Sequence, residues 1–302
     1  MMTATHRRAG TAVLAELAGS WITRRVDILG VGVSAIDMPI ALELIDQWIS
    51  NGEHQYVCVT GVHGIMESQR DPRLRDVQNR SGLTTPDGMP LVWAGHAAGA
   101  RPMERVYGPD LMLALCDLAS VRGFSSFFYG GRPGVADRLA QRLQDLYPGL
   151  KVAGTYSPPF REPSAAEDED IVRLINEARP DVVWVGLGTP KQELWMAAHA
   201  ARLDASVLIG VGAAFDIHAG LSPQAPRWMQ RSGLEWAFRL THEPRRLWRR
   251  YLYNNPRFLA GMAMAPPRLV TVSPTASDLP PATGSPRVSH SGSMKGVSDD
   301  CG

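Results

Sequence analysis

The segment Phe127-Phe-Tyr-Gly-Gly-Arg-Pro-Gly-Val135 decides the fold class, because an apolar run passes through a glycine-rich turn into an amphipathic helix predicted over 134–146. This order is typical of a buried strand followed by a helix. The turn directs backbone N–H groups and the positive end of the helix towards one place, which favours an anion. We predict that Gly130 and Gly131 contact such an anion and that Arg132 adds a charged hydrogen bond. An ordinary strand-to-helix turn is the alternative.

The same alternation of strand and helix extends outward in both directions, from about residue 27 to about residue 259. It predicts a Rossmann-like α/β fold with a mainly parallel sheet flanked by helices. In such folds ligands bind at the loops that follow the strands. The predicted strands are 26–30, 55–60, 125–129, 151–155, 181–186 and 206–211, and three of the predicted helices are 39–49, 134–146 and 191–201.

Two further loops repeat the strand-to-helix pattern. Gly186-Leu-Gly-Thr-Pro-Lys-Gln-Glu193 puts Pro190 in a first helical turn, where Lys191 and Gln192 are presented to a ligand. Gly210-Val-Gly-Ala-Ala-Phe-Asp216 is the third such loop. Three glycine-rich loops together indicate a nucleotide site, and our candidate contacts in these two loops are Gly188, Lys191, Gln192, Gly212 and Asp216.

The composition excludes several classes of protein. With 302 residues, 44% hydrophobic and 20% charged, the chain is predicted to be soluble and globular. Its net charge of +1 argues against a nucleic-acid partner. Cys58, Cys116 and Cys301 form no CxxC pair, so neither disulfides nor a zinc site is indicated and a reducing cytoplasm fits best. We find no signal peptide and no transmembrane helix in the sequence.

Two alternative sites are disfavoured. Gly30-Val-Gly-Val-Ser-Ala35 matches G-x-G-x-x-A, but the next predicted strand lacks the terminal acidic residue that would hold a ribose. A dinucleotide-dependent oxidoreductase is therefore the weaker reading, and we predict no cofactor. Asp168-Glu-Asp170 is similar to a metal-binding carboxylate group, but Ser164-Ala-Ala-Glu167 is a capping box that places it in a first helical turn. We therefore predict no metal ion.

A basic, aromatic segment lies between residues 227 and 258, with eight arginines and three tryptophans. In Pro244-Arg-Arg-Leu-Trp-Arg-Arg-Tyr-Leu252, arginines and apolar residues each recur at i,i+4, which predicts an amphipathic helix. Such a helix can simply pack on the core, or it can lie at an anionic membrane surface where its arginines reach diphosphates. We predict an appendage over 234–259, a disordered tail over 260–302 and a flexible segment over 1–23.

The stretch Leu83-Thr-Thr-Pro-Asp-Gly-Met-Pro90 presents a carboxylate in a rigid setting. Pro86 fixes the backbone, Gly88 permits a turn, and Pro90 can begin a helix, so Asp87 stands beside a helix N-terminus. A carboxylate held in this way can act in catalysis. The alternative is that Asp87 only caps the helix or shapes the turn.

Across roughly residues 26–259 these segments resemble the WecG/TagA/CpsF glycosyltransferases, also called glycosyltransferase family 26. The resemblance implies an inverting, metal-independent enzyme that moves N-acetylmannosamine or a related sugar from a UDP-sugar to a polyprenyl-diphosphate-linked acceptor. It also implies a peripheral membrane protein that acts on the inner face of the cytoplasmic membrane, in the synthesis of a surface polysaccharide. The catalytic domain is then expected over residues 24–233. The motifs that carry it are Asp87-Gly-Met-Pro-Leu-Val-Trp93, Arg105-Val-Tyr-Gly-Pro-Asp-Leu111, the loops 186–193 and 210–216, Glu235-Trp-Ala-Phe-Arg239 and Glu243-Pro-Arg-Arg-Leu-Trp-Arg-Arg250.

The resemblance also implies roles for single residues. Asp87 matches the proposed catalytic base, and Thr60 and Gln192 match positions that contact the sugar. The leaving UDP is then met by Gly130, Gly131 and positive charges, for which the candidates are Arg105, Arg239, Arg246 and Arg249. Many members have asparagine where this chain has Val62, with His63 beside it, which leaves the donor sugar open.

The C-terminal segment resembles an appendage that closes over the active site. The resemblance implies that closure occurs when the protein meets a membrane or when it dissociates from a homo-oligomer. Removing the residues after Gly233 is expected to abolish transfer and leave a folded core. An alternative of another class is a UDP-binding module that docks on a membrane without catalysis.

Overall fold

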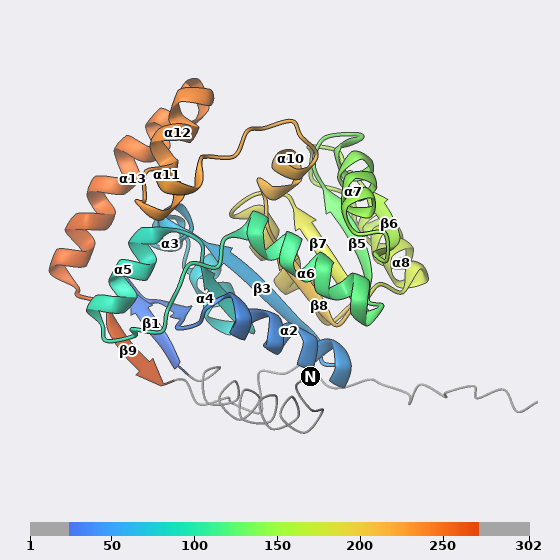
Figure 1. Cartoon of the computed structure of the whole chain (residues 1–302), viewed down its shortest axis with the longest axis horizontal. Helices are drawn as coiled ribbons and strands as arrows, with labels where there is room; N and C mark the ends of the chain where they lie inside the picture. Colours follow the sequence, from blue (N-terminus) through green and yellow to red (C-terminus); the bar gives the residue numbers. More distant parts are fainter. Residues whose placement is uncertain (1–23, 272–302) are drawn as a thin grey trace, which may run out of the picture.

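The computed structural model of this protein describes residues 24–271 (Figure 1). Residues 1–23 and 272–302 lie outside the described part. The predicted flexible N-terminal segment, most of the predicted tail and Cys301 therefore lie outside it as well.

Six parallel strands form the central sheet, in the order β4-β3-β8-β7-β5-β6. These strands are apolar because helices cover both faces of the sheet, so that Val182, Val183 and Trp184 of β7 are all fully buried. The predicted Rossmann-like α/β fold is confirmed. The strands are β3 (Gln55–Thr60), β4 (Leu83–Pro86), β5 (Ser125–Gly130), β6 (Lys151–Tyr156), β7 (Val182–Gly186) and β8 (Val207–Gly210).

Successive residues of each strand point to opposite faces, and each face has its own core. Phe128 and Trp184 belong to one core, whereas Tyr129 and Val183 belong to the other. Figure 1 shows the resulting layers of helix, sheet and helix. The first core includes residues of α2 (Met38–Asn51), α6 (Gly108–Arg122), α7 (Val135–Leu146) and α10 (Ala214–His218), and the second includes residues of α4 (Pro72–Arg80), α8 (Ala165–Ala178) and α9 (Lys191–His199).

A second, antiparallel sheet has the order β2-β1-β9 and a small core of its own. Its strands are β1 (Arg24–Ile28), β2 (Val31–Ser34) and β9 (Arg268–Thr271). The match to G-x-G-x-x-A therefore begins in a hairpin turn, where Leu29 and Gly30 have φ of 54° and 82°. A dinucleotide fingerprint requires a strand that enters a helix, so this segment is not one.

Three helices precede β9 and were predicted only in part, namely α11 (Arg227–Arg231), α12 (Glu235–His242) and α13 (Pro244–Met264). The remaining helices, α3 (Val62–Ser68) and α5 (Met89–Ala97), contribute residues to the small core. The predicted boundary at 259 and the predicted disorder from 260 are wrong for residues 260–271. Met262 and Leu269 pack against the small core, and β9 pairs with β1, so tertiary contacts order this segment.

The acidic residues near 168 cap a helix, as predicted. Ser164 Oγ accepts a hydrogen bond from the Glu167 amide at 3.3 Å, and the Glu167 carboxylate accepts from the Ser164 amide at 2.7 Å. Asp168 lies in the first turn of α8 and contacts the side chains of His199 and Arg202 at 3.0 and 2.6 Å.

Candidate active site

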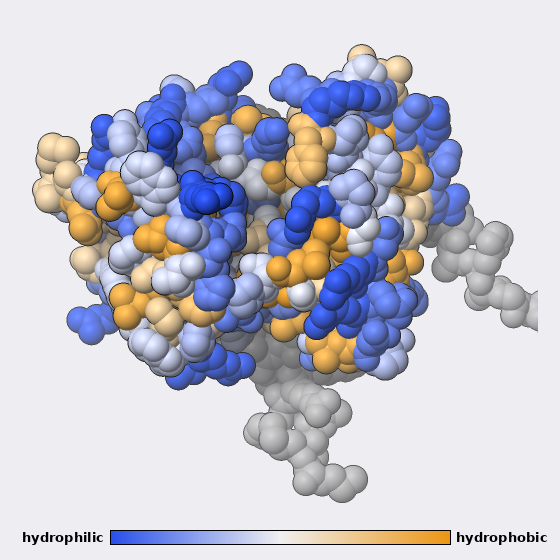
Figure 2. All heavy atoms as spheres, turned by 90° about the horizontal axis from the view of Figure 1, so that it is seen from above, coloured by the Kyte–Doolittle hydropathy of each residue, from blue (hydrophilic) through white to orange (hydrophobic). Residues whose placement is uncertain are grey.

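The strand order places a topological switch point between β3 and β8. After β3 the chain forms β4 on one side, and then crosses to β5 on the other side of β8 and β7. The register aligns Thr60 with Pro86, and Cys58 with Gly210, so the carboxyl ends of these three strands adjoin. Ligands of open α/β sheets bind at such a point. Seen from above, the molecule is hollowed at this end, with hydrophilic side chains around the hollow (Figure 2).

Asp87 directly follows β4 and is half-buried. Its backbone N–H donates to the Thr60 carbonyl at 2.9 Å, which fixes it against β3. Its Oδ1 accepts a hydrogen bond from the Gly108 amide at 3.0 Å. Its Oδ2 has no partner among the described residues and lies 3.6 Å from the point where a Cβ on Gly61 would stand. One oxygen is thus held while the other is open for a proton.

The electrostatic surroundings favour a proton on Asp87. Burial raises the pKa of this carboxyl above its ordinary value, the charge of Arg105 opposes that rise, and the charge of Glu235 adds to it. A raised pKa makes a carboxylate a better proton acceptor, because the proton it receives is held more tightly.

Arg105 links Asp87 to the C-terminal helices. Its Nε donates to the Asp87 carbonyl, its Nη1 donates to Gln230 Oε1 at 3.3 Å, and its Nη2 forms an ion pair with Glu235. Its guanidinium also lies 3.9 Å from the centre of the Tyr107 ring. These donors are engaged by the protein in this arrangement, so Arg105 holds α11 and α12 over the base.

Thr60 and Gln192 are both buried at the switch point. Thr60 Oγ1 accepts a hydrogen bond from Gln78 at 3.1 Å. Gln192 Oε1 accepts from the Gly188 amide at 3.1 Å, and its Nε2 donates to Glu193 at 3.2 Å. The same Oε1 lies 3.3 Å from a Cβ position on Gly212, so the loops after β7 and β8 meet at Gln192. The neighbouring Lys191 is exposed at the start of α9.

The loop after β5 lies on the far side of the switch point. The Gly131 amide donates to the Gly186 carbonyl at 3.0 Å, so in this arrangement it is not open to an anion as the sequence suggested. Gly130 packs so closely on Gly186 that a Cβ there would stand 2.6 Å from backbone. Arg132 and Asp216 are brought together at 3.5 Å on the surface.

The C-terminal arginines divide into two sets. Arg239 is half-buried, and its charge acts on Asp87. Arg246 and Arg249 are exposed on α13, the first paired with Glu243 and the second 5.2 Å from the centre of the Trp248 ring.

The sequence gave no role to four other residues of this region, Tyr107, Gln230, Glu235 and Arg250. Tyr107, Glu235 and Arg250 lie within the quoted motifs, which is the one signal that could have pointed to them.

Known proteins are similar to this chain over most of its length. The family model described as "Glycosyl transferase WecG/TagA/CpsF family" matches residues 26–268. The chain belongs to this family. The matched range contains Asp87, Arg105, Gln192 and the whole of α12 and α13, so these residues lie in the shared part of this glycosyltransferase.

Three relatives of this chain share the same protein name. Proteins of Bacillus spizizenii and Bacillus subtilis are 31% and 33% identical, over 62% and 59% of this chain and 70% and 67% of their own lengths. A Staphylococcus aureus protein is 26% identical, over 80% of this chain and 94% of its own length. All three are named N-acetylglucosaminyldiphosphoundecaprenol N-acetyl-beta-D-mannosaminyltransferase.

Proposed function

We propose that this glycosyltransferase inverts the anomeric centre of a UDP-sugar, carrying N-acetylmannosamine or a related sugar, as it transfers that sugar to a polyprenyl-diphosphate-linked acceptor without a metal ion. The product enters a cell-surface polysaccharide or glycopolymer. The names of the relatives support the substrate classes. The single observation that carries the chemistry is the placement of Asp87, with one oxygen held by Gly108 and the other open beside the switch point.

In this reaction Asp87 takes the proton of the acceptor hydroxyl while that oxygen attacks the anomeric carbon. UDP leaves from the opposite face of the sugar, so one displacement inverts the configuration. The bond to the diphosphate oxygen breaks as the new glycosidic bond forms, and the proton ends on the carboxyl.

The negative charge that develops on UDP needs donors or cations nearby. The half-buried Arg239 is the best placed of the predicted cations, because its charge already acts on Asp87. Thr60 is buried at the carboxyl end of β3 and Gln192 is buried at the start of α9, and both are proposed to contact the sugar. Arg105 is proposed to position Asp87 and the appendage rather than to contact UDP, because its donors are already engaged.

We also propose that the protein works on the inner face of the membrane. Along α13 the side chains of Trp248, Leu252 and Leu259 are exposed by 46%, 68% and 68%, interspersed with arginines. A helix of this kind lies in the interface of an anionic bilayer. No helix in residues 24–271 has the length and apolar character needed to cross a bilayer.

UDP release from a panel of UDP-sugars, with and without polyprenyl-diphosphate-linked acceptors and in EDTA, tests this function. We expect acceptor-dependent release that persists in EDTA and is lost in Asp87→Asn. Binding of UDP without turnover of any donor would instead favour the non-catalytic module.

A further inference from the structure

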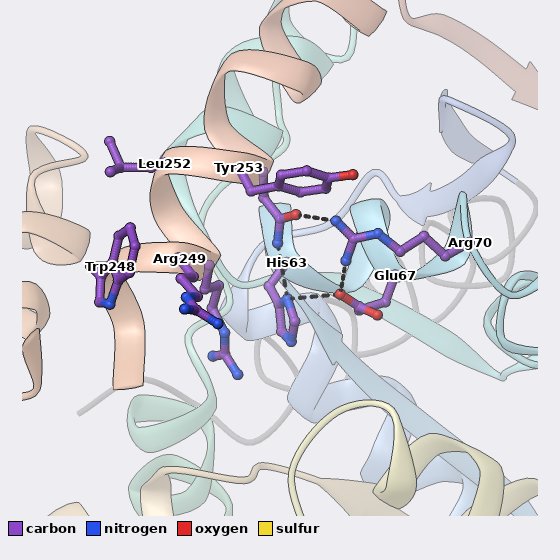
Figure 3. Close-up of a pocket in the computed structure, with 9 residues that line it drawn as sticks. His63, Glu67, Arg70, Trp248, Arg249, Leu252 and Tyr253 are labelled. Carbon is purple, nitrogen blue, oxygen red and sulfur yellow. Dashed lines mark hydrogen bonds and ion pairs between the residues drawn. The ribbon is translucent and has the colours of Figure 1, made fainter. Parts of the chain in front are cut away.

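A cleft of about 460 Å³ lies between α3 and α13, beside the candidate active site (Figure 3). The helix α3 begins two residues after Thr60, so its first turn borders the switch point. The cleft combines charged groups with exposed aromatic and aliphatic side chains, and the reaction described above gives no role to its His63, Arg250 or Asn254.

A chain of side-chain contacts crosses the cleft and sets the state of His63. Arg70 can only donate, so the Asn254 atom that it contacts at 2.8 Å is the carbonyl oxygen. The other atom of that amide, Nδ2, is a donor and contacts His63 Nδ1 at 3.2 Å. The Glu67 carboxylate lies 3.6 Å from the same nitrogen, which is beyond hydrogen-bond distance, so the amide contact decides that Nδ1 is the acceptor and that the ring proton is on Nε2.

Electrostatics keep this ring neutral. Burial, followed by the charges of Arg250, Arg70 and Arg239, lowers the pKa of His63 to about 3. His63 therefore offers one neutral N–H donor, and its Nε2 has no partner among the described residues.

Arg250 is the most informative residue of the cleft. It is half-buried, and it has neither an ion pair nor a hydrogen bond within residues 24–271. Burial lowers its pKa, and the nearby charges of Arg246 and Arg239 lower it further. Tyr251 and the carboxylate of Glu67, which lines the cleft and pairs with Arg70, oppose this fall of the pKa. A guanidinium that is removed from water among other cations is stabilised by an anion with oxygens in fork geometry, such as a phosphate.

The open side of the cleft is apolar. Trp248, Leu252 and Tyr253 are exposed by 46%, 68% and 49%, and they line the cleft next to its cations. An occupant that fits both parts has a phosphate group attached to a hydrocarbon chain.

We propose that the α3–α13 cleft binds the diphosphate of the polyprenyl-linked acceptor, with Arg250 and the Nε2–H of His63 contacting phosphate oxygens and Trp248 and Leu252 contacting the first isoprene units. This inference rests on the proposed function. The diphosphate of UDP is the weaker occupant, because the glycine-rich loops lie after β5, β7 and β8, on the other side of the switch point from α3. The charge of Arg239 acts on both His63 and Asp87, so the cleft and the base are near one another, and an acceptor held by its diphosphate in the cleft has its sugar near the base.

Calorimetric titration of the full chain with farnesyl diphosphate, farnesyl monophosphate and UDP tests the inference. We expect Arg250→Gln to weaken the binding of farnesyl diphosphate by about tenfold or more, as for the loss of a charge-assisted hydrogen bond, and to leave UDP binding unchanged. The matched control is Arg245→Gln, because Arg245 is exposed on the same helix outside the cleft. An equal loss for UDP, or no loss for farnesyl diphosphate in a variant that melts like wild type, would overturn the inference.

The transfer assay separates this inference from the proposed function. An Arg250→Gln enzyme with a raised KM for the acceptor and an unchanged KM for the donor supports both. Normal acceptor kinetics in that variant would sink the cleft assignment and leave the function standing. Arg250-dependent binding of farnesyl diphosphate in a protein that transfers no sugar would uphold the cleft and refute the function.

Discussion

The ion pair between Arg105 and Glu235 is expected to hold the C-terminal helices over the base, and Glu235→Ala tests this directly. The two side chains are exposed by only 13% and 15%, so the pair lies between the surface and the buried case. Exposed pairs contribute roughly 0.2–1 kcal/mol, and removing one partner of a buried pair costs roughly 3–5 kcal/mol. We expect a cost of about 2 kcal/mol, which multiplies the opening equilibrium of α12 by about 30.

Hydrogen exchange of the amides in 235–242 measures this opening, because local unfolding is read from their protection. Glu243→Ala is the matched control, since Glu243 directly precedes α13 and pairs with Arg246 in the first turn of that helix, with side chains exposed by 36% and 56%. That loss is expected to be below about 0.5 kcal/mol. The reasoning fails if protection of 235–242 is unchanged in Glu235→Ala, or if it falls equally in β7 and β8.

Three further predictions concern the base. Asp87→Asn is expected to lower kcat by about 10²- to 10⁴-fold with UDP affinity retained, since it removes general-base catalysis alone; a smaller loss in single-turnover rates argues against that role. Burial raises the pKa of Asp87, and the charge of Glu235 raises it further, so activity is expected to be lost on acidification at a pH above the ordinary pKa range of an aspartate. Glu235→Gln should move this acid limb of the pH–rate profile to lower pH. An acid limb that stays in place or moves to higher pH contradicts the assignment. Gly61→Ala is expected to lower the melting temperature only a little, because its φ of −112° suits any residue and the loss is that of a glycine at an N-cap. It is expected to slow transfer by about tenfold, because the added methyl group occupies space 3.6 Å from Oδ2 of Asp87, where the acceptor hydroxyl approaches. Gly88→Ala, whose Cβ would stand 3.6 Å from Pro90 instead, is the control, and equal effects of the two on transfer would remove the argument.

Local sequence was sufficient to predict a strand or helix wherever the segment itself has a clear hydrophobic period and clear turn residues. The run through Phe127–Val135 predicted β5 and α7 because apolar burial, glycine turns and helix periodicity all act within a few residues. The strand β4 was not predicted, because four residues that end in proline give little periodicity. The hairpin β1–β2 was missed as a hairpin because the same glycines also match a nucleotide fingerprint.

Non-local contacts decided the rest. Strand β9 is ordered by its pairing with β1, more than 230 residues away in the chain. The composition of the region after residue 260 cannot reveal such a distant contact, and it therefore suggested disorder. The ion pair of Arg105 with Glu235 spans 130 residues, and it converts an arginine expected at the leaving group into a tether for the appendage.

The sequence by itself determined the α/β class, the glycine-rich loops, the capping of α8 and, through its motifs, the family. Those properties follow from neighbouring residues. Only the tertiary structure decided that one oxygen of Asp87 stays open, that the Gly131 amide is already engaged, and that Arg250 lines a cleft without an ion pair or hydrogen bond in the part of the chain that the structure describes. These depend on which strands and helices pack together, and burial and pairing of charges arise only when distant segments meet.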